Sequence, residues 1–406
     1  MNAVGIDVSK GKSMVAAVNL AKEVTMKPQE FEHNEIGLER LIYNHLLSLD
    51  GEVRVIMEAT GRYHEPIAAA LHEAGIYVSV VNPLVIHDYG NNSIRRTKTD
   101  RKDALKIARY GVDNWAELRE YTPLDTMRQQ LKLMNRQYNF YMKHVVQHQN
   151  NLIALLDKTF PGANELFTSQ MRKDGNQKWV DFAATFWHCD CIARTGQKAF
   201  TTRYKNWCKR KGYNFSEEKA YDVYVSSLGH WTTLPKNSFT KLLITTACNQ
   251  LISANKWLAA IKTELLRIAA LMPEYEQVKA FYGVGEITAA GLIAEIGDVR
   301  RFDNRSSLIA FAGVDPSTNQ SGKYQSKSGT ASKRGSPHLR MTLFQVVSTH
   351  LKRAPVNEPV FLFLNRKRAE GKPYYVYMTA AANKFLRIYF GIIKPFLISL
   401  EVTETR

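Results

Sequence analysis

The sequence predicts an α/β domain at the N-terminus followed by mainly α-helical domains, in a chain of 406 residues. Short apolar runs alternate with stretches of helical periodicity over the first part of the chain, as they do in α/β sheets. Two later stretches place apolar residues at alternating spacings of three and four, which predicts a coiled coil. The last third begins with a Gly-x-Gly turn that opens a helix. We therefore expect domains over residues 1–122, 123–272 and 273–406.

The charge of the chain indicates a polyanionic partner. Hydrophobic residues make up 45% of the sequence and charged residues 23%, which is ordinary for a folded protein. The formal net charge of +17 is not ordinary, and nucleic acid is the commonest partner of so basic a protein. No apolar run reaches the roughly 18 residues of a membrane span, and the N-terminus is unlike a signal peptide. Four cysteines are too few for a disulfide scaffold, so we expect a cytoplasmic protein with no membrane partner.

The beginning of the chain alternates between strand and helix patterns. Two short β-rich runs on either side of Gly11 predict a hairpin. Apolar runs of the buried type and a further helical pattern then lead to Asn82-Pro83, which closes a strand. The expected elements are strands over Ala3–Val8 and Ser13–Val18, a helix over Ile36–Leu49, a strand over Val53–Met57, a helix from about His64 to Ala74 and a strand over Ile76–Val81. This order predicts an α/β sheet.

Four acidic residues lie where strands end or a helix begins. Asp7 lies in the first strand, Glu58 ends a later one, and Asp100 and Asp103 open a helix. Residues three apart share a helix face, and an acid in a buried strand is costly unless it is paired or ligated. Carboxylates suit magnesium or manganese, and two such ions about 3.5–4 Å apart serve phosphoryl transfer. The alternative is a solvated ion-pair surface, because seven lysines and arginines lie within residues 95–109.

Residues 123–272 contain the two coiled-coil seams. The first seam lies within residues 124–155 and the second within 244–272, where Pro273 ends the pattern. Each helix would be roughly 45 to 50 Å long at 1.5 Å per residue. The two seams can pair with each other, with a second subunit, or with both. We expect His148, on the first seam, to be a polar seam residue and not a metal ligand.

Between the seams, residues 160–239 read as an insertion at the tip of the hairpin. The cluster His188–Cys191, with Cys208 further on, invites a zinc site, but no C-x₂-C is present and no second pair closes the site. We therefore expect partly buried thiols, with zinc as the alternative. The basic and aromatic stretch Lys198–Tyr213 has two interpretations. It could track RNA or single-stranded DNA, or it could be a charged helix face with aromatic residues in the core.

The last domain contains two candidate nucleic-acid contacts. Gly283 and Gly285 form a turn that opens a helix, as in helix–hairpin–helix elements, and the free backbone amides of such a turn point at a phosphate. A loop rich in glycine, serine and lysine lies within residues 310–335. Cations of this block would neutralise nearby phosphates. They are Lys323, Lys327, Lys333, Arg334 and Arg340.

Several motifs resemble those of one family. GIDVSK, MEATGRYH and KTDRKDALKIARY resemble the signature of the DEDD insertion-sequence transposases, the group that includes the Piv-like invertases. The QSG tripeptide, the KRG turn, the following HLR and the closing stretch GKPYYVYMTAAANKFLRIYFGIIK resemble the C-terminal transposase domain of that family. The resemblance covers about residues 1–160 and 240–400. It implies a RuvC-like, ribonuclease-H-type fold for the N-terminal half.

The resemblance also implies roles for particular residues. Asp7, Glu58, Asp100 and Asp103 would be the metal-binding tetrad, with Mg²⁺ or Mn²⁺ as the cofactor. Ser321 matches the position of the essential serine of the family. A serine is a poor nucleophile until a neighbour activates it, and three further serines of the same loop remain alternatives. They are Ser317, Ser326 and Ser328.

The function implied by the resemblance is recombination of a mobile insertion sequence. Metal-dependent cleavage and exchange of double-stranded donor and target DNA would pass through a phosphoserine link, guided by a structured RNA of the element. The subunits would form a dimer or tetramer, with an intrachain hairpin that also builds a subunit contact. One rival is a hydrolytic RuvC-like nuclease such as a junction resolvase, which needs the acids but no serine. The other is a non-enzymatic nucleic-acid-binding protein that uses only charge and the coiled coil.

Overall fold

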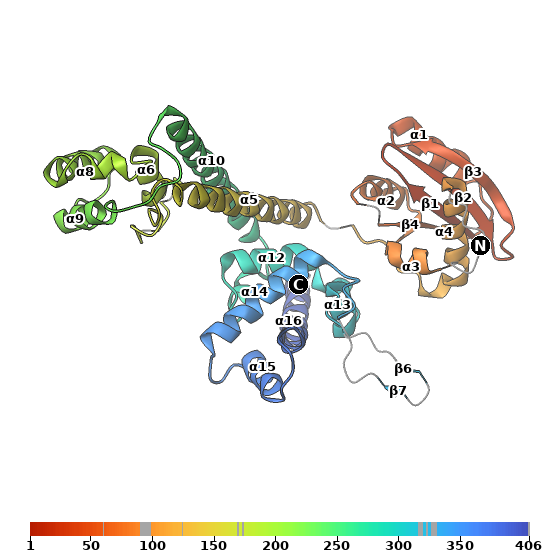
Figure 1. The fold of residues 1–406 in the computed structure, drawn as a ribbon. Helices are drawn as coiled ribbons and strands as arrows, with labels where there is room; N and C mark the ends of the chain where they lie inside the picture. The colour runs from red at the N-terminus through yellow and green to blue at the C-terminus, as the bar shows by residue number, and fades with distance from the viewer. Residues whose placement is uncertain are drawn as a thin grey trace. The chain divides into compact units, whose positions relative to one another are not determined.

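The protein folds into two compact units, Met1–Leu124 and Asp125–Arg406, drawn in Figure 1. The computed structural model describes residues 1–59, 61–89, 99–123, 125–168, 170–172, 174–315 and 331–402, and the backbone alone of 320–321, 324–325 and 403–404. The fold class is mixed α/β, with helices in the majority, as the sequence predicts. The division of the chain into three domains stays a prediction.

The N-terminal unit contains a five-stranded sheet with the order β3-β2-β1-β4-β5. The strands are β1 (Asn2–Val8), β2 (Lys12–Asn19), β3 (Val24–Glu32), β4 (Val53–Glu58) and β5 (Tyr77–Val81). The predicted hairpin of β1 and β2 is confirmed, and β4 and β5 run parallel to β1. β3 was not predicted from the sequence, because this edge strand buries only Met26 and Phe31. The strand order agrees with the ribonuclease-H-type fold that the resemblance implies.

Helices cover both faces of this sheet. They are α1 (Glu35–Leu41) with the π-helical turn Ile42–Leu46, α2 (His64–Glu73), α3 (Pro83–Asp88), α4 (Asp100–Asp113) and the 3₁₀ turn Trp115–Glu117. Val4 and Ile6 face a core that includes Leu41 and Leu71, from the helices of one side. Ala3, on the alternate face of β1, packs in a second core with residues of α4. The position of α4 sets the geometry of the acids.

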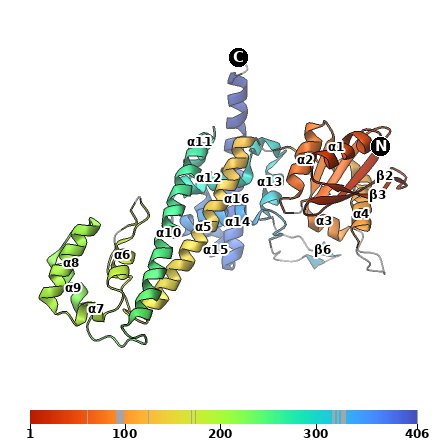
Figure 2. The ribbon, with the colours of Figure 1, turned by 90° about the horizontal axis from the view of Figure 1, so that it is seen from above.

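The second unit begins with two long helices that pack antiparallel, as Figure 2 shows. They are α5 (Thr126–Leu156) and α10 (Ser238–Ala269). Leu131, near the start of α5, shares a core with Leu265, near the end of α10. Leu152, near the end of α5, shares a different core with Ile244. The two seams therefore meet within one chain, while their description as a coiled coil stays a prediction.

The segment between the long helices is a folded helical module beyond one end of the pair (Figures 1 and 2). It contains α6 (Lys178–Thr185), α7 (Asp190–Ala193), α8 (Gln197–Lys211) and α9 (Glu217–Ser226). Its core is rich in aromatic side chains, among them Phe160, Phe182 and Trp207, and continues into Leu156 and Ile244 of the long helices. The module is thus anchored on α5 and α10 by one shared core.

The C-terminal part packs its helices around one that is buried over most of its length. It contains α11 (Tyr275–Lys279), α12 (Glu286–Ile296), the 3₁₀ turn Val299–Arg301, α13 (Arg305–Ala312), β6 (Gln320–Ser321), β7 (Tyr324–Gln325), α14 (Pro337–Arg353), α15 (Pro359–Ala369) and α16 (Tyr374–Glu404). Every residue of α12 from Ala289 to Ile296 is buried. Arg128 of α5 donates to buried Glu274 at 2.5 Å and so ties α5 to this core. No helix among the described residues is long and apolar enough to cross a membrane.

Candidate functional site

Helix α4 lies very close to the sheet because glycines stand at the points of contact. A Cβ atom on Gly5 would lie 2.1 Å from the carbonyl oxygen of Ala104 and 2.4 Å from the amide nitrogen of Ala108. A Cβ atom on Gly111 would lie 2.3 Å from the Cδ1 atom of Ile56. A larger side chain at either glycine would push the helix away. The small residues therefore hold α4 against β1 and β4.

The strand register brings two of the predicted acids side by side. Gly5 of β1 pairs with Ile56 of the parallel strand β4. Two residues further along, the same register sets Asp7 beside Glu58, and side chains two apart point to the same face. Because Gly5 and Ile56 face α4, Asp7 and Glu58 do so too. Both are partly buried at the carboxyl ends of their strands.

The other two acids extend the buried face of α4. That face consists of Ala104, Ile107, Ala108 and Gly111, at spacings of three and four. Asp100 lies four residues before Ala104, and Asp103 four before Ile107, so both continue the same face toward the helix start. Because Gly111 lies near Ala3 and Ala104 near Gly5, α4 runs antiparallel to β1. Its first turn therefore lies toward the strand end that carries Asp7.

Electrostatics agree with this location of Asp100. Lys12, at the start of β2, is held by Glu30 at 2.7 Å. The hydrogen bond and charge of Glu30 raise the pKa of Lys12, and the charge of Asp100 raises it further. Thr99 caps α4 by accepting a hydrogen bond from the amide of Lys102 at 3.4 Å, which confirms the predicted helix start.

The donor chemistry of the tetrad fits hard divalent cations. Asp7, Glu58, Asp100 and Asp103 offer only carboxylate oxygens, the ligands that magnesium and manganese prefer. No three of these acids have ligand oxygens within 4.8 Å of one another, so they do not form a compact site for a single ion. Among the described residues, the group at His188 does meet that spacing. A pair of ions needs a wider set of ligands than one ion does. The assignment of the four acids to one metal site stays a prediction.

The side chains of His188, Cys189 and Asp190 lie close enough together to hold a metal ion, and each has a contact within the protein, so zinc there stays the alternative prediction. The backbone amide of Asp190 donates to Nδ1 of His188 at 3.1 Å, and Nε2 donates to the carbonyl of Leu234 at 3.1 Å, so both ring nitrogens are occupied. Asp190 itself pairs with Arg194 at 2.6 Å. Burial raises the pKa of the thiol of Cys189, which opposes the thiolate that zinc needs. Cys191 and Cys208 are buried free thiols as well. The expectation of buried thiols is confirmed.

The Gly-x-Gly turn joins α11 to α12. Gly283 has a φ of +77°, which favours glycine, and a Cβ atom there would lie 3.0 Å from the imidazole of buried His350. Gly285 caps α12 without a side-chain hydrogen bond. Glu286, in the first turn of α12, places a negative charge beside the free amides. A phosphate contact at Gly283 and Gly285 stays a prediction.

The loop that carries the candidate serine is tied together at its base. A Cβ atom on Gly335 would lie 2.1 Å from the carbonyl oxygen of Phe311, so the two ends of the loop touch through backbone. Arg340 donates from Nη1 to the carbonyls of Ala312 at 3.1 Å and Gly335 at 2.9 Å. Ser332 donates from its hydroxyl to Asp315 at 2.5 Å.

Only part of the predicted serine site lies within the described residues. The backbone of Ser321 forms β6, paired with β7, and its side chain is outside the described residues. Lys323 and the alternative serines Ser317, Ser326 and Ser328 are outside them too, as is Lys327. Lys333 and Arg334 are exposed beside the loop base. The acids belong to the first compact unit and the serine to the second.

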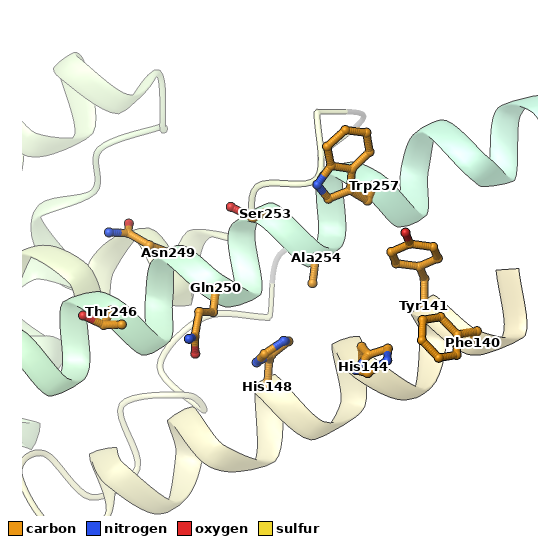
Figure 3. A pocket seen from close by; sticks show the side chains of 10 residues that line it. All are labelled: Phe140, Tyr141, His144, His148, Thr246, Asn249, Gln250, Ser253, Ala254 and Trp257. Atoms are coloured by element: carbon orange, nitrogen blue, oxygen red, sulfur yellow. The ribbon is translucent and has the colours of Figure 1, made fainter. Parts of the chain in front are cut away.

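An open groove of about 600 Å³, which was not predicted from the sequence, runs between α5 and α10 (Figure 3). Tyr141 and His148 of the first seam line its wall and are half-buried. Trp257 of α10 lines it too and is 63% exposed. The first seam is therefore packed only in part. His148 belongs to no metal-ligating group within the described ranges.

An acid tetrad on a sheet of this topology is typical of metal-dependent enzymes that act on nucleic acid. The comparison with protein families is more specific. Residues 4–161 match the model of IS110-type DEDD transposases, and residues 275–359 match the model described as "Transposase IS116/IS110/IS902 family". The chain belongs to the IS110/IS116 family of transposases, which are enzymes that act on DNA.

Curated relatives match along almost the whole chain. The pilin gene-inverting protein of Moraxella bovis is 25% identical over 96% of this chain and 95% of its own length. The uncharacterized 44.8 kDa protein of insertion element IS116 from Streptomyces clavuligerus is 22% identical over 99% of this chain and 98% of its own length. T. thermophilus RuvC in complex with a Holliday junction substrate is 14% identical over 29% of this chain and 96% of that chain. Its TM-score of 0.23 is too low to support an argument.

Proposed function

We propose that this transposase cuts and rejoins DNA strands with an acid tetrad as the cation site and Ser321 as the nucleophile. The tetrad is Asp7, Glu58, Asp100 and Asp103. The observation that carries the proposal is the location of the acids. Asp7 and Glu58 lie on the face of the sheet that α4 covers, and Asp100 and Asp103 continue the face of α4 that packs on the sheet. Acids on two faces that meet repel one another, and bound cations would relieve that repulsion.

The tetrad residues would bind the cations and orient them against the scissile phosphate. Magnesium or manganese, when bound there, supplies Lewis-acid polarisation of a phosphoryl oxygen. Asp7 and Glu58 extend from strands whose backbone is fixed by the sheet, which favours a preorganised site. Asp100 and Asp103 extend from the first turn of a helix held in place by Gly5 and Gly111.

The serine step conserves the phosphodiester bond. Oγ of Ser321 attacks the scissile phosphorus, its proton passes to a base, and an O–P bond to serine forms while the bond to the leaving deoxyribose oxygen breaks. That oxygen takes up a proton. A deoxyribose hydroxyl of another strand then attacks the phosphoserine, and serine regains its proton. The number of phosphoester bonds is unchanged, so no nucleotide hydrolysis is needed.

The loop base supports this assignment. The backbone contact of Gly335 with Phe311 and the two hydrogen bonds of Arg340 hold the ends of the serine loop together. A nucleophile needs such positioning, because a displacement of about 1 Å costs roughly a hundredfold in rate. Lys333 and Arg334 extend from the same base and would contact phosphates.

We also propose that a structured RNA of the element selects donor and target DNA. The formal net charge of +17 supports two nucleic-acid partners bound together. In such an arrangement base pairing reads the sequence, and the protein contacts backbone and shape. Subunits would associate as a dimer or tetramer through the long helices.

A covalent adduct tests the central proposal. Wild-type protein incubated with labelled cognate DNA ends and magnesium should yield a protein–DNA species that survives a denaturing gel. Ser321→Ala should bind DNA and form none, because the hydroxyl contributes little to binding. Ser317→Ala, Ser326→Ala and Ser328→Ala are the matched controls and should keep the adduct. Efficient cleavage by wild type with no covalent species would instead favour a hydrolytic nuclease.

A further inference from the structure

We propose that the exposed face of α8 binds the sugar–phosphate backbone of duplex DNA, as a contact separate from the tetrad and the serine loop. α8 belongs to the module between the two family matches, which end at residue 161 and resume at residue 275. The transposase chemistry described above gives this module no role.

Every aromatic side chain of α8 is used inside the protein. Phe200, Tyr204 and Trp207 are buried, and Tyr204 stacks on Trp207 with ring centroids 5.5 Å apart. Trp207 also donates from Nε1 to the hydroxyl of Thr185 at 3.1 Å. No aromatic ring of this helix is left to stack on a base. The aromatic residues of α8 are therefore core residues, as the interpretation of Lys198–Tyr213 as a charged helix face expects.

The opposite side of α8 carries a stripe of lysines. Lys198, Lys205 and Lys209 are exposed and lie at spacings of seven and four, on the side away from Phe200 and Tyr204. The stripe is about 16 Å long at 1.5 Å per residue. α8 contains no aspartate or glutamate, so no acid on the helix offsets this charge.

Two other cations of α8, Arg203 and Lys211, already have partners within the protein. Arg203 donates to the carbonyl of Cys191 at 3.0 Å, and Lys211 pairs with buried Asp181 at 2.9 Å. Across the described ranges, no carboxylate forms an ion pair with Lys198 or Lys209. Lys205 lies over the ring of Phe215, with its ammonium nitrogen 5.7 Å from the ring centroid, and no carboxylate of the described residues neutralises its charge there. The charges of the stripe are therefore available to an external anion.

Helix stability does not account for the stripe. Cations stabilise the last turn of a helix through the macrodipole, which explains Lys209 and Lys211. Lys198 lies in the first turn, where a positive charge is unfavourable. A cation that has no protein partner and opposes the helix dipole indicates that binding, and not folding, accounts for its presence.

Duplex DNA is the polyanion that this face fits best. Lysine side chains contact phosphates, and such contacts hold a protein on the duplex without reading its sequence. The major groove of B-form DNA is about 12 Å wide and admits a helix. The major groove of an RNA duplex is deep and narrow and does not. The exposed face has no large apolar side chain that would suit a protein partner.

Charge removal on the stripe tests the proposal in the full chain. The triple variant Lys198→Gln, Lys205→Gln and Lys209→Gln should bind a random-sequence DNA duplex more weakly than wild type. The slope of log affinity against log salt should become shallower by about 3, roughly one for each lost phosphate contact. Circular dichroism and the melting temperature should stay unchanged, because the three side chains are exposed.

A matched control removes the same charge elsewhere. Lys22→Gln, Lys279→Gln and Lys367→Gln remove three lysines that already pair with Asp113 at 2.6 Å, Glu276 at 2.8 Å and Glu370 at 2.7 Å. This variant should keep the wild-type salt slope. The triple replacement of the stripe by arginine should keep it as well, because arginine retains the charge.

A measurement on wild-type protein keeps the proposal testable if the variant misfolds. Duplex DNA should protect Lys198, Lys205 and Lys209 from acetylation, read by mass spectrometry, while Lys279 and Lys367 stay reactive. An unchanged salt slope for the folded stripe variant would overturn the proposal. So would an equal effect of the control variant, or protection of the stripe by an RNA duplex and not by DNA.

Discussion

Gly5 and Gly111 carry no side chains at the two points where α4 approaches the sheet, and each position is closed to a larger residue. The first turn of α4, with Asp100 and Asp103, would move outward if either glycine were enlarged. The site therefore depends on residues that have no functional group. We did not predict these glycines as site residues, although Ala104, Ala108 and Gly111 form a small-residue face that carries the signal.

Asp103→Asn tests the tetrad within one helix. The variant should lose recombination while it stays folded, because removing one of several clustered negative charges relieves repulsion. Calorimetric titration should show weaker magnesium or manganese binding. Asp113→Asn is the matched control, since Asp113 lies in the last turn of the same helix and pairs with Lys22 at 2.6 Å. Recombination at the wild-type rate by Asp103→Asn would refute the tetrad.

At the scale of elements, the two long helices use their seams differently. The seam of α10 is buried at almost every position from Ile244 to Ile268. The seam of α5 is buried at Leu131, Val145 and Leu152 but opens into the groove at Tyr141 and His148. Two cores, one at each end of the pair, hold the C-terminal helices and the helical module on α5 and α10.

Two leucines of α10 give a direct test of this scaffold. Leu251→Asp should destabilise the second unit strongly, because Leu251 is 1% exposed and the new charge would be buried. The loss should exceed the cost of Leu251→Ala, which is about 2–5 kcal/mol for a buried leucine. Leu242→Asp, at 64% exposure on the same helix, should have little effect. Urea unfolding followed by circular dichroism measures both. Equal stability of the two variants would contradict the packing of α5 on α10.

At the scale of the whole molecule, the acids and Ser321 belong to different compact units. The proposed reaction therefore needs both units on one DNA strand, within one chain or between subunits. The formal net charge of +17 suits a protein that holds several nucleic-acid segments at once. The α8 stripe would add a further point of attachment.

Guidance by RNA makes a prediction about the assembled particle. Protein produced in cells together with the non-coding segments that flank its gene should purify with one discrete RNA, identified by sequencing. Recombination of cognate DNA ends should be lost after ribonuclease treatment and restored by adding the RNA back. Protein produced without those segments is the control and should carry no discrete species. Full activity of RNA-free protein would exclude guidance.

Local pattern was sufficient for the elements with strong periodicity. The start of α4 at Asp100 follows from its helical pattern, and the buried face of α10 follows from its heptads. The residue types of the tetrad and its motifs were enough to indicate a DEDD transposase, and the family comparison agrees. These features depend on neighbours within a few residues, which a sequence displays directly.

Other features depend on contacts between distant residues. β3 was not predicted because this half-exposed edge strand lacks a clear alternation of apolar and polar residues. The aromatic residues of α8 fit either a core or a base-stacking surface until the packing of Trp207 in the module showed which side is buried. The approach of Asp7 and Glu58 to α4 required the register of β1 with β4 and the contact at Gly5. Side-chain periodicity reports which face of an element is apolar, but the partner of that face is set by packing across the fold.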